Sequence, residues 1–143
     1  MEQIQLRFRV SNTDADSPLS LLIHLDNQQL ESLLIAQPTD VVYDLELEDG
    51  DHELRLTLQG KTAAHTVIDE QGHIIKDAML QFSNVEMDDI NIDNIVQELA
   101  VYTHDFNGSG TLTQERFFHA QGCNGTVSLK FASPFYLWLL ESM

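Results

Sequence analysis

The chain has little of several residue types, and each shortage excludes a class of protein. Its single cysteine, Cys123, excludes an intrachain disulfide and a multi-cysteine metal site. Only seven lysines and arginines stand against 23 aspartates and glutamates, and this net charge of −16 argues against binding to nucleic acid or to anionic membrane surfaces. No apolar run reaches the ~18 residues of a membrane span. The first ten residues alternate and do not resemble a signal peptide, so we expect a protein made in a cytoplasm.

Short runs of alternating apolar and polar residues fill most of the chain, and such runs are typical of half-buried strands. The expected strands cover residues 4–10, 19–25, 28–35, 43–47, 54–58, 78–82, 85–87, 99–104 and 115–119, together with a C-terminal segment. There is no strong amphipathic helix and no βαβ pattern. We therefore expect an all-β protein, a jelly-roll-like sandwich of two antiparallel sheets that forms a single domain over residues 1–143.

Turn residues between these runs predict the connections. Asp49-Gly50 between two alternating runs predicts a β-hairpin, and a second, small hairpin is expected at residues 70–72. A change of register near Asp88-Asp89 predicts a bulge or corner. The segment before His104 is ambiguous, because Asp93 is a plausible helix cap while β-branched and aromatic residues favour a strand; we expect a strand over its end, residues 99–104.

The C-terminal segment is the most apolar part of the chain. After the alternating run that ends near Phe131, six apolar residues follow one another from Phe135 to Leu140. Such a run fits a strand covered on both faces, or a plug of aromatic residues that closes a core. We expect an internal strand, with Phe131, Phe135, Leu137 and Leu139 in the core and Trp138 on the opposite face.

One loop resembles the start of a calcium-binding EF-hand loop. Asp105, Asn107 and Ser109 occupy its first, third and fifth places, and Gly110 occupies the sixth. The glutamate required at the twelfth place is replaced by Arg116, and the flanking segments read as strands. A polar β-turn is therefore the favoured interpretation, and no cofactor is expected. A weak calcium site formed by the three oxygen-bearing side chains is the alternative.

Catalytic motifs are not found, so we do not expect an enzyme. The six histidines are scattered, and none has the spacing of a metal site such as HExxH. His104 next to Asp105 lacks the nucleophile elbow that a serine hydrolase requires.

Sugar-binding surfaces combine exposed aromatic rings with polar side chains. Tyr102 and Phe106, with Asn107 beside them, are the candidate carbohydrate-binding residues. The alternative is that these aromatics belong to the core and to an ordinary surface.

Two blocks of sequence carry a resemblance to known proteins. The first contains residues 49–54, 61–62, 65–69, 72–74 and 76–77, and the second contains residues 102–108, 122–125 and 133–141, which end in PFYLWLLE. Together they resemble small virion-associated proteins of tailed bacteriophages, especially those of cyanobacterial and marine myoviruses. The first block also resembles calcium-dependent, xylan-binding carbohydrate-binding modules, which are jelly-roll sandwiches. Their metal-ligand loop is not intact here, so this second likeness implies the fold and not the binding residues.

The phage resemblance implies a non-catalytic structural component of a tail, baseplate, fibre or capsid decoration. Such a component is located in the virion after assembly in the host cytoplasm. Its partners are other virion proteins, in multiple copies or as a homo-oligomer. The alternative is a carbohydrate-binding module, possibly assisted by calcium, that attaches to glycans on the host surface. Neither function involves nucleic acid or a membrane span.

Overall fold

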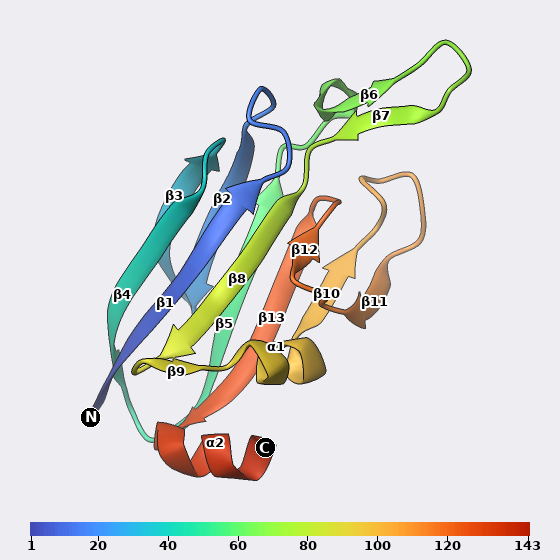
Figure 1. Cartoon of the computed structure of the whole chain (residues 1–143). Coiled ribbons are helices and arrows are strands. Elements are labelled where there is room, and N and C mark those ends of the chain that lie inside the picture. The colour runs from blue at the N-terminus through green and yellow to red at the C-terminus, as the bar shows by residue number, and fades with distance from the viewer.

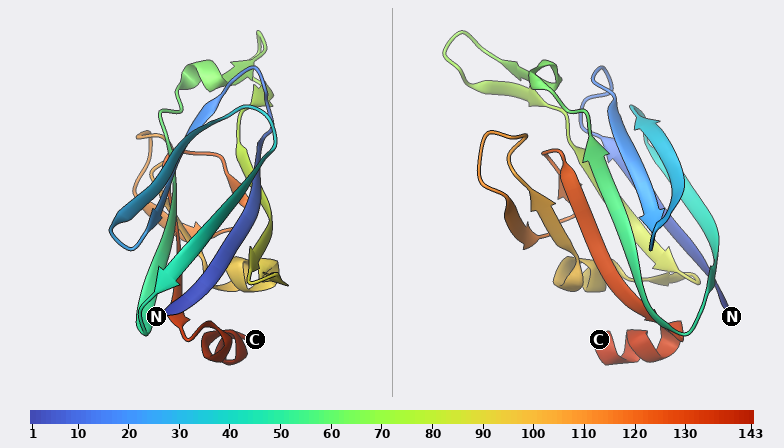
Figure 2. Two further views of the ribbon diagram at one scale, coloured as in Figure 1. Left: turned by 90° about the vertical axis from the view of Figure 1, so that its left-hand side faces the viewer. Right: turned by 180° about the vertical axis from the view of Figure 1, so that it is seen from behind.

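Two antiparallel sheets face each other and enclose the core, which confirms the expected sandwich (Figures 1 and 2). The computed structural model describes residues 1–143. The five-stranded sheet contains β1 (Glu2–Asn12), β4 (Thr39–Leu47), β8 (Leu80–Met87), β9 (Ile90–Asn91) and β12 (Ala120–Gln121). The six-stranded sheet contains β2 (Leu19–Leu25), β3 (Gln28–Ile35), β5 (Gly50–Gln59), β10 (Val101–His104), β11 (Thr113–Arg116) and β13 (Gly125–Ser133). A separate two-stranded hairpin, β6 (Thr66–Ile68) and β7 (Ile74–Asp77), follows the short 3-10 helix η1 (Ala63–His65).

The order of strands is β12–β8–β1–β4 in the first sheet, with β9 beside β8, and β11–β10–β13–β5–β2–β3 in the second. Alternation along each strand places one set of side chains between the sheets, where 31 buried apolar residues form one core. Within this core the aromatic ring of Phe82 in β8 lies 6.0 Å from that of Phe8 in the neighbouring strand β1, and 5.6 Å from that of Phe117 in the connection between β11 and β12, measured between ring centroids.

The expected hairpin at Asp49-Gly50 is wrong. β4 pairs with β1 in the five-stranded sheet, whereas β5 pairs with β13 and β2 in the six-stranded sheet, so this turn crosses from one sheet to the other. The backbone of Gly50 has φ +120°, a conformation that residues with a side chain rarely adopt, so the sharp corner requires a glycine here. The Asp-Gly pair, which is typical of hairpin turns, therefore forms a corner between the two sheets here. The small hairpin expected at residues 70–72 is confirmed as the β6–β7 turn.

The change of register near Asp88-Asp89 is a tight turn. Both residues have positive φ, and Met87 lies opposite Ile90 where β8 returns as β9. The bulge lies earlier in β8, at Asn84, where the register with β1 shifts.

The ambiguous segment before His104 contains both kinds of structure. A helix, α1 (Asp93–Leu99), precedes β10, so the expected strand begins at Val101 and not at residue 99. The side chain of Asp93 accepts a hydrogen bond from the backbone of Val85 at 2.8 Å, which fixes the start of the helix to β8.

The C-terminal segment divides at Pro134. β13 lies between β10 and β5, as expected of an internal strand, but the apolar run after it forms a helix, α2 (Phe135–Ser142), and the expected strand there is wrong. Phe135 and Trp138 are buried, three residues apart on one helix face, and Leu137 is 58% exposed. Proline is compatible with the start of a helix, because the backbone N–H that it lacks would be unpaired there. α2 thus closes one end of the core as the aromatic plug that was the alternative.

Candidate functional site

A groove of about 500 Å³ crosses the outer face of the six-stranded sheet. Strands β5, β13, β10 and β11 and the end of α1 supply its nine lining residues. Seven of them carry hydrogen-bonding side chains and two are aliphatic: Glu53, Arg55, Thr103, Gln114, Thr126, Ser128 and Lys130, with Leu99 and Val101. These side chains point outward because their neighbours in each strand fill the core.

Part of the groove is held in place by contacts among its own residues and with the backbone of Asp26. The hydroxyl of Ser128 donates to the Glu53 carboxylate at 2.6 Å. Arg55 donates to the backbone carbonyl of Asp26 at 2.8 Å, and its Nε lies 3.5 Å from the Glu53 carboxylate. The carboxylate and the guanidinium of this part are therefore oriented before any ligand arrives.

Three other side chains of the groove are free to meet a ligand. Thr103, Gln114 and Lys130 make no side-chain hydrogen bond or ion pair with the rest of the chain. With the aliphatic surface of Val101 between them, they suit a ligand that presents many hydroxyl groups and some C–H surface.

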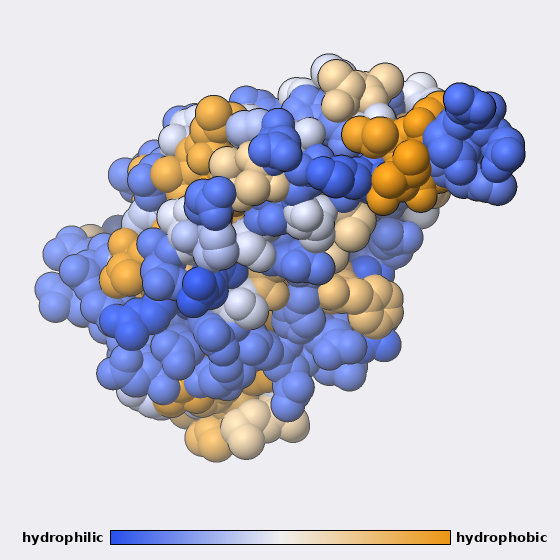
Figure 3. Space-filling model, turned by 45° about the horizontal axis from the view of Figure 1, so that its top comes forward, coloured by the Kyte–Doolittle hydropathy of each residue, from blue (hydrophilic) through white to orange (hydrophobic).

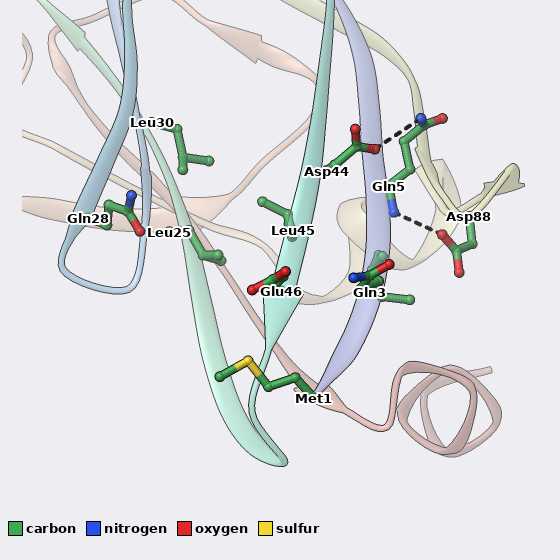
Figure 4. Close-up of a pocket in the computed structure, with 11 residues that line it drawn as sticks. Met1, Gln3, Gln5, Leu25, Gln28, Leu30, Asp44, Leu45, Glu46 and Asp88 are labelled. Carbon is green, nitrogen blue, oxygen red and sulfur yellow. Dashed lines mark hydrogen bonds between the residues drawn. The ribbon is translucent and has the colours of Figure 1, made fainter.

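A larger hollow, of about 720 Å³, lies around the first residues of β1 and the end of β4. Figure 4 shows that β4 divides it: Leu25, Leu30 and Leu45 lie on one side of the strand, and polar residues that include Gln5 and Asp88 lie on the other. The backbone N–H of Gln5 donates to Asp88 at 2.8 Å, so these polar groups satisfy one another. The polar groups do not converge on one cavity, which makes this hollow a poorer binding site than the groove.

Tyr102, one of the candidate sugar-binding residues, points into the core and is only 4% exposed. Its hydroxyl donates to the carbonyl of Cys123 and accepts from the backbone N–H of that residue. Burial raises the pKa of Tyr102 to about 12. The expectation of an exposed ring at this position is wrong, because β10 turns residues 102 and 104 inward.

Phe106 is exposed, at 48%, in the loop that follows β10. Its ring packs edge-on against the ring of His104, with centroids 4.7 Å apart. The ring also lies against Gly110, where an added Cβ would come within 2.7 Å of the ring. Asn107, next to it, accepts a hydrogen bond from the backbone of Asn124 at 2.7 Å. The loop therefore presents one supported aromatic ring and one amide near each other.

The three candidate calcium ligands lie in this loop, and the side chain of each already makes a hydrogen bond: Asn107 with the backbone of Asn124, and the other two within the loop. Asp105 accepts from the backbone of Gly108 at 2.8 Å, and Ser109 donates to the carbonyl of Phe106 at 2.7 Å. These contacts are those of a polar turn. No group of three or more His, Cys, Asp or Glu side chains has the arrangement of a metal site. Calcium binding by Asp105, Asn107 and Ser109 stays a prediction.

The single cysteine lies near the same end of the molecule and is half-buried. Burial raises the pKa of the Cys123 thiol, which disfavours the thiolate that a nucleophile requires.

Comparison with known proteins identifies a solved structure with a similar fold. No family model and no curated protein matches the sequence. A solved structure described as "vCBM60 in complex with galactobiose" is similar to the chain, with a TM-score of 0.57 and 12% sequence identity, over 87% of this chain and 96% of that one. The chain has the fold of a carbohydrate-binding module.

This likeness agrees with the weaker of the two sequence resemblances, the one to carbohydrate-binding modules. The resemblance to virion-associated phage proteins finds no support in the comparisons and stays a prediction. No helix has the length and apolar character needed to span a membrane.

Sequence reasoning missed the groove on the six-stranded sheet. Its residues alternate with core residues, so the outward direction of Thr103, Ser128 and Lys130 was visible in the pattern. Their proximity was not visible, because β5 and β13 are neighbours in the sheet although they lie about half the chain apart in sequence.

Proposed function

We propose that the chain is a non-catalytic carbohydrate-binding module and that the groove on the six-stranded sheet is its glycan-binding surface. The observation that carries this proposal is the fold likeness, over nearly the whole of both chains, to a module whose structure was solved with galactobiose. The groove supports it, since most of its lining side chains carry hydrogen-bond donors or acceptors that can pair with the hydroxyl groups of a sugar.

The size of the groove indicates an oligosaccharide as ligand. The groove crosses four neighbouring strands, and the three intervals between them span about 14 Å. A ligand of that length contacts Gln114 at one side and the Glu53–Arg55 pair at the other, with Val101 under its C–H surface. Because no aromatic ring lines the groove, hydrogen bonds supply most of the recognition and we expect a weak affinity.

The loop that carries Phe106 and Asn107 is a second candidate surface for the same function, favoured by the exposed ring of Phe106. Tyr102 would act there by positioning the neighbouring backbone rather than by touching sugar. Calcium bound by Asp105, Asn107 and Ser109 would belong to this second surface.

The proposal is tested by screening the chain on a glycan array and measuring affinities by calorimetry, with galactobiose as the first probe. In the groove, Gln114→Ala combined with Lys130→Ala should weaken binding about tenfold or more. The matched control is Lys76→Ala, which removes an exposed cation of the β6–β7 hairpin away from the groove, and this variant should bind as the unaltered chain does.

Three outcomes separate the alternatives. Loss of binding in the groove double variant, with Phe106→Ala and a chelator without effect, supports the groove. Loss in Phe106→Ala with the double variant unaffected overturns the groove as the site and places binding in the loop, and sensitivity to a chelator would add calcium to it. Binding to no glycan overturns the proposed function.

A place on a phage particle is the remaining proposal from the sequence resemblance, with other virion proteins as partners. Mass spectrometry of purified particles tests it directly, and absence of the chain from them contradicts it.

A further inference from the structure

A second hollow, of about 280 Å³, adjoins the groove at the edge of the six-stranded sheet. It is lined by residues 98–101, where α1 ends and β10 begins, and by residues 114–116 of β11. This edge hollow shares Leu99, Val101 and Gln114 with the groove, so the two form one continuous surface. In the right-hand view of Figure 2 the six-stranded sheet faces the viewer, with α1 and β11 at its edge.

The pairing of the strands leads from the groove to the edge hollow in one row. Arg55 of β5 lies opposite Ser128 of β13. Val101 of β10 lies opposite Ser128 on one side and opposite Arg116 of β11 on the other. Directly opposed residues of an antiparallel sheet point to the same face, which here is the outer one. An extended ligand that crosses the sheet along this row therefore arrives at Arg116.

The guanidinium of Arg116 is held in position and keeps donors for a ligand. Its Nε and Nη2 donate to the backbone carbonyl of Gln97, both at 3.3 Å, and Nη2 also donates to the Glu98 carboxylate at 3.2 Å. Its Nη1 makes no hydrogen bond with the chain, and the side chain is 52% exposed. The two N–H groups of Nη1 are therefore available to the hydroxyl oxygens of a sugar.

Phe118 follows Arg116 on the same side of the chain. Phe117 between them is buried, so the alternation turns Phe118 outward, where it is 62% exposed. The guanidinium carbon of Arg116 lies 5.5 Å from the centroid of the Phe118 ring, within the range of a cation–π contact. This contact positions an exposed aromatic ring at the end of the row.

We propose that Arg116 and Phe118 form a further sugar-binding subsite, over which a longer oligosaccharide continues beyond the groove. The Phe118 ring stacks against the C–H face of one sugar unit, and the Nη1 of Arg116 donates to a hydroxyl group of the same unit. Because Glu98 balances the charge of Arg116, the subsite suits a neutral sugar. This inference rests on the proposed function of the groove, and it supplies the aromatic ring that the groove itself lacks.

Calorimetry with galactobiose and longer galactose oligomers, or the same series of another sugar that the glycan array selects, tests the subsite. In the unaltered chain the affinity should rise from the disaccharide to the longer oligomers. Phe118→Ala should remove this rise, so that the longer oligomers bind about tenfold more weakly while the disaccharide binds as before. Phe118→Trp keeps a flat ring and should retain the rise, whereas Phe118→Leu keeps only apolar bulk and should lose it.

The matched control is an equally exposed apolar residue outside both hollows. Figure 3 shows apolar surface beside the polar tip of the β6–β7 hairpin, and Ile75 of this hairpin is 62% exposed, as Phe118 is. Ile75→Ala should bind every oligomer as the unaltered chain does.

The outcomes keep the subsite and the proposed function apart. Disaccharide binding by Phe118→Ala shows that this variant is folded, and loss of the rise in it but not in Ile75→Ala supports the subsite. An affinity that does not rise with length, or a rise that Phe118→Ala leaves intact, overturns the subsite while the proposed function stands. Equal weakening of short and long oligomers in Phe118→Ala also contradicts a subsite beyond the groove. Binding to no oligomer overturns the proposed function, and the subsite with it.

Discussion

The C-terminal segment after Pro134 forms the helix α2, and a mutational test can distinguish this helix from a strand at the same place. A strand over residues 135–140 would put Leu137 in the core and Trp138 on the opposite face. The helix instead buries Phe135, at 0% exposure, and Trp138, at 9%, and it leaves Leu137 58% exposed. Alanine substitutions at Phe135 and Leu137 should therefore have very different effects on the free energy of unfolding.

The magnitude follows from what each side chain contacts. The ring of Phe135 packs against that of Trp138, with centroids 5.9 Å apart, and Trp138 in turn lies 6.1 Å from the ring of Phe131 in β13. Phe135→Ala removes the fully buried ring of this group and leaves a cavity, which costs about 3–5 kcal/mol. Leu137→Ala removes an exposed side chain and should change stability by no more than about 0.5 kcal/mol.

Urea unfolding measures both variants. Trp138 is the only tryptophan and lies among these rings, so its fluorescence reports on this end of the core, and far-ultraviolet circular dichroism reports on the sheets. A loss of about 3–5 kcal/mol is large beside the 5–15 kcal/mol of a typical domain, so the midpoint for Phe135→Ala should fall markedly. If Leu137→Ala proves as costly as Phe135→Ala, the helical assignment and the reasoning from it are wrong.

The sheets were predictable because the alternation of apolar and polar residues is a direct record of which side chains face the core. The connections were less predictable. Asp49-Gly50 has the composition of a hairpin turn, but turn composition does not specify whether the next strand pairs with the last one or crosses to the other sheet. The chain crosses to the other sheet because β5 pairs there on both edges, with β2 and with β13. The second of these partners, β13, comes much later in the sequence.

The same limit applies to the candidate site. Tyr102 alternates with Val101 and Thr103, so its inward direction was readable once β10 was placed. The groove was not readable, because Lys130 and Arg55 share a surface only through the pairing of β13 with β5. A site built across strands depends on strand order, which local sequence does not encode.

Two further predictions concern single polar contacts. Burial alone would lower the pKa of His52, but the carboxylate of Asp26 at 2.8 Å raises it overall. Stability from this pair is thus full below the unfolded pKa of about 6.5 and is lost as pH rises through the higher native pKa. The urea midpoint should fall over that range in the unaltered chain and not in His52→Gln; matching pH profiles would contradict this. Tyr102→Phe leaves the backbone N–H and C=O of Cys123 without their partner, and each unpaired buried group is costly. This substitution should lower stability by about 1–3 kcal/mol and speed hydrogen exchange at the Cys123 amide. Tyr136→Phe, at an exposed hydroxyl without a partner, is the control and should do neither. An unchanged exchange rate in Tyr102→Phe would show that the Tyr102 hydroxyl does not hold the loop.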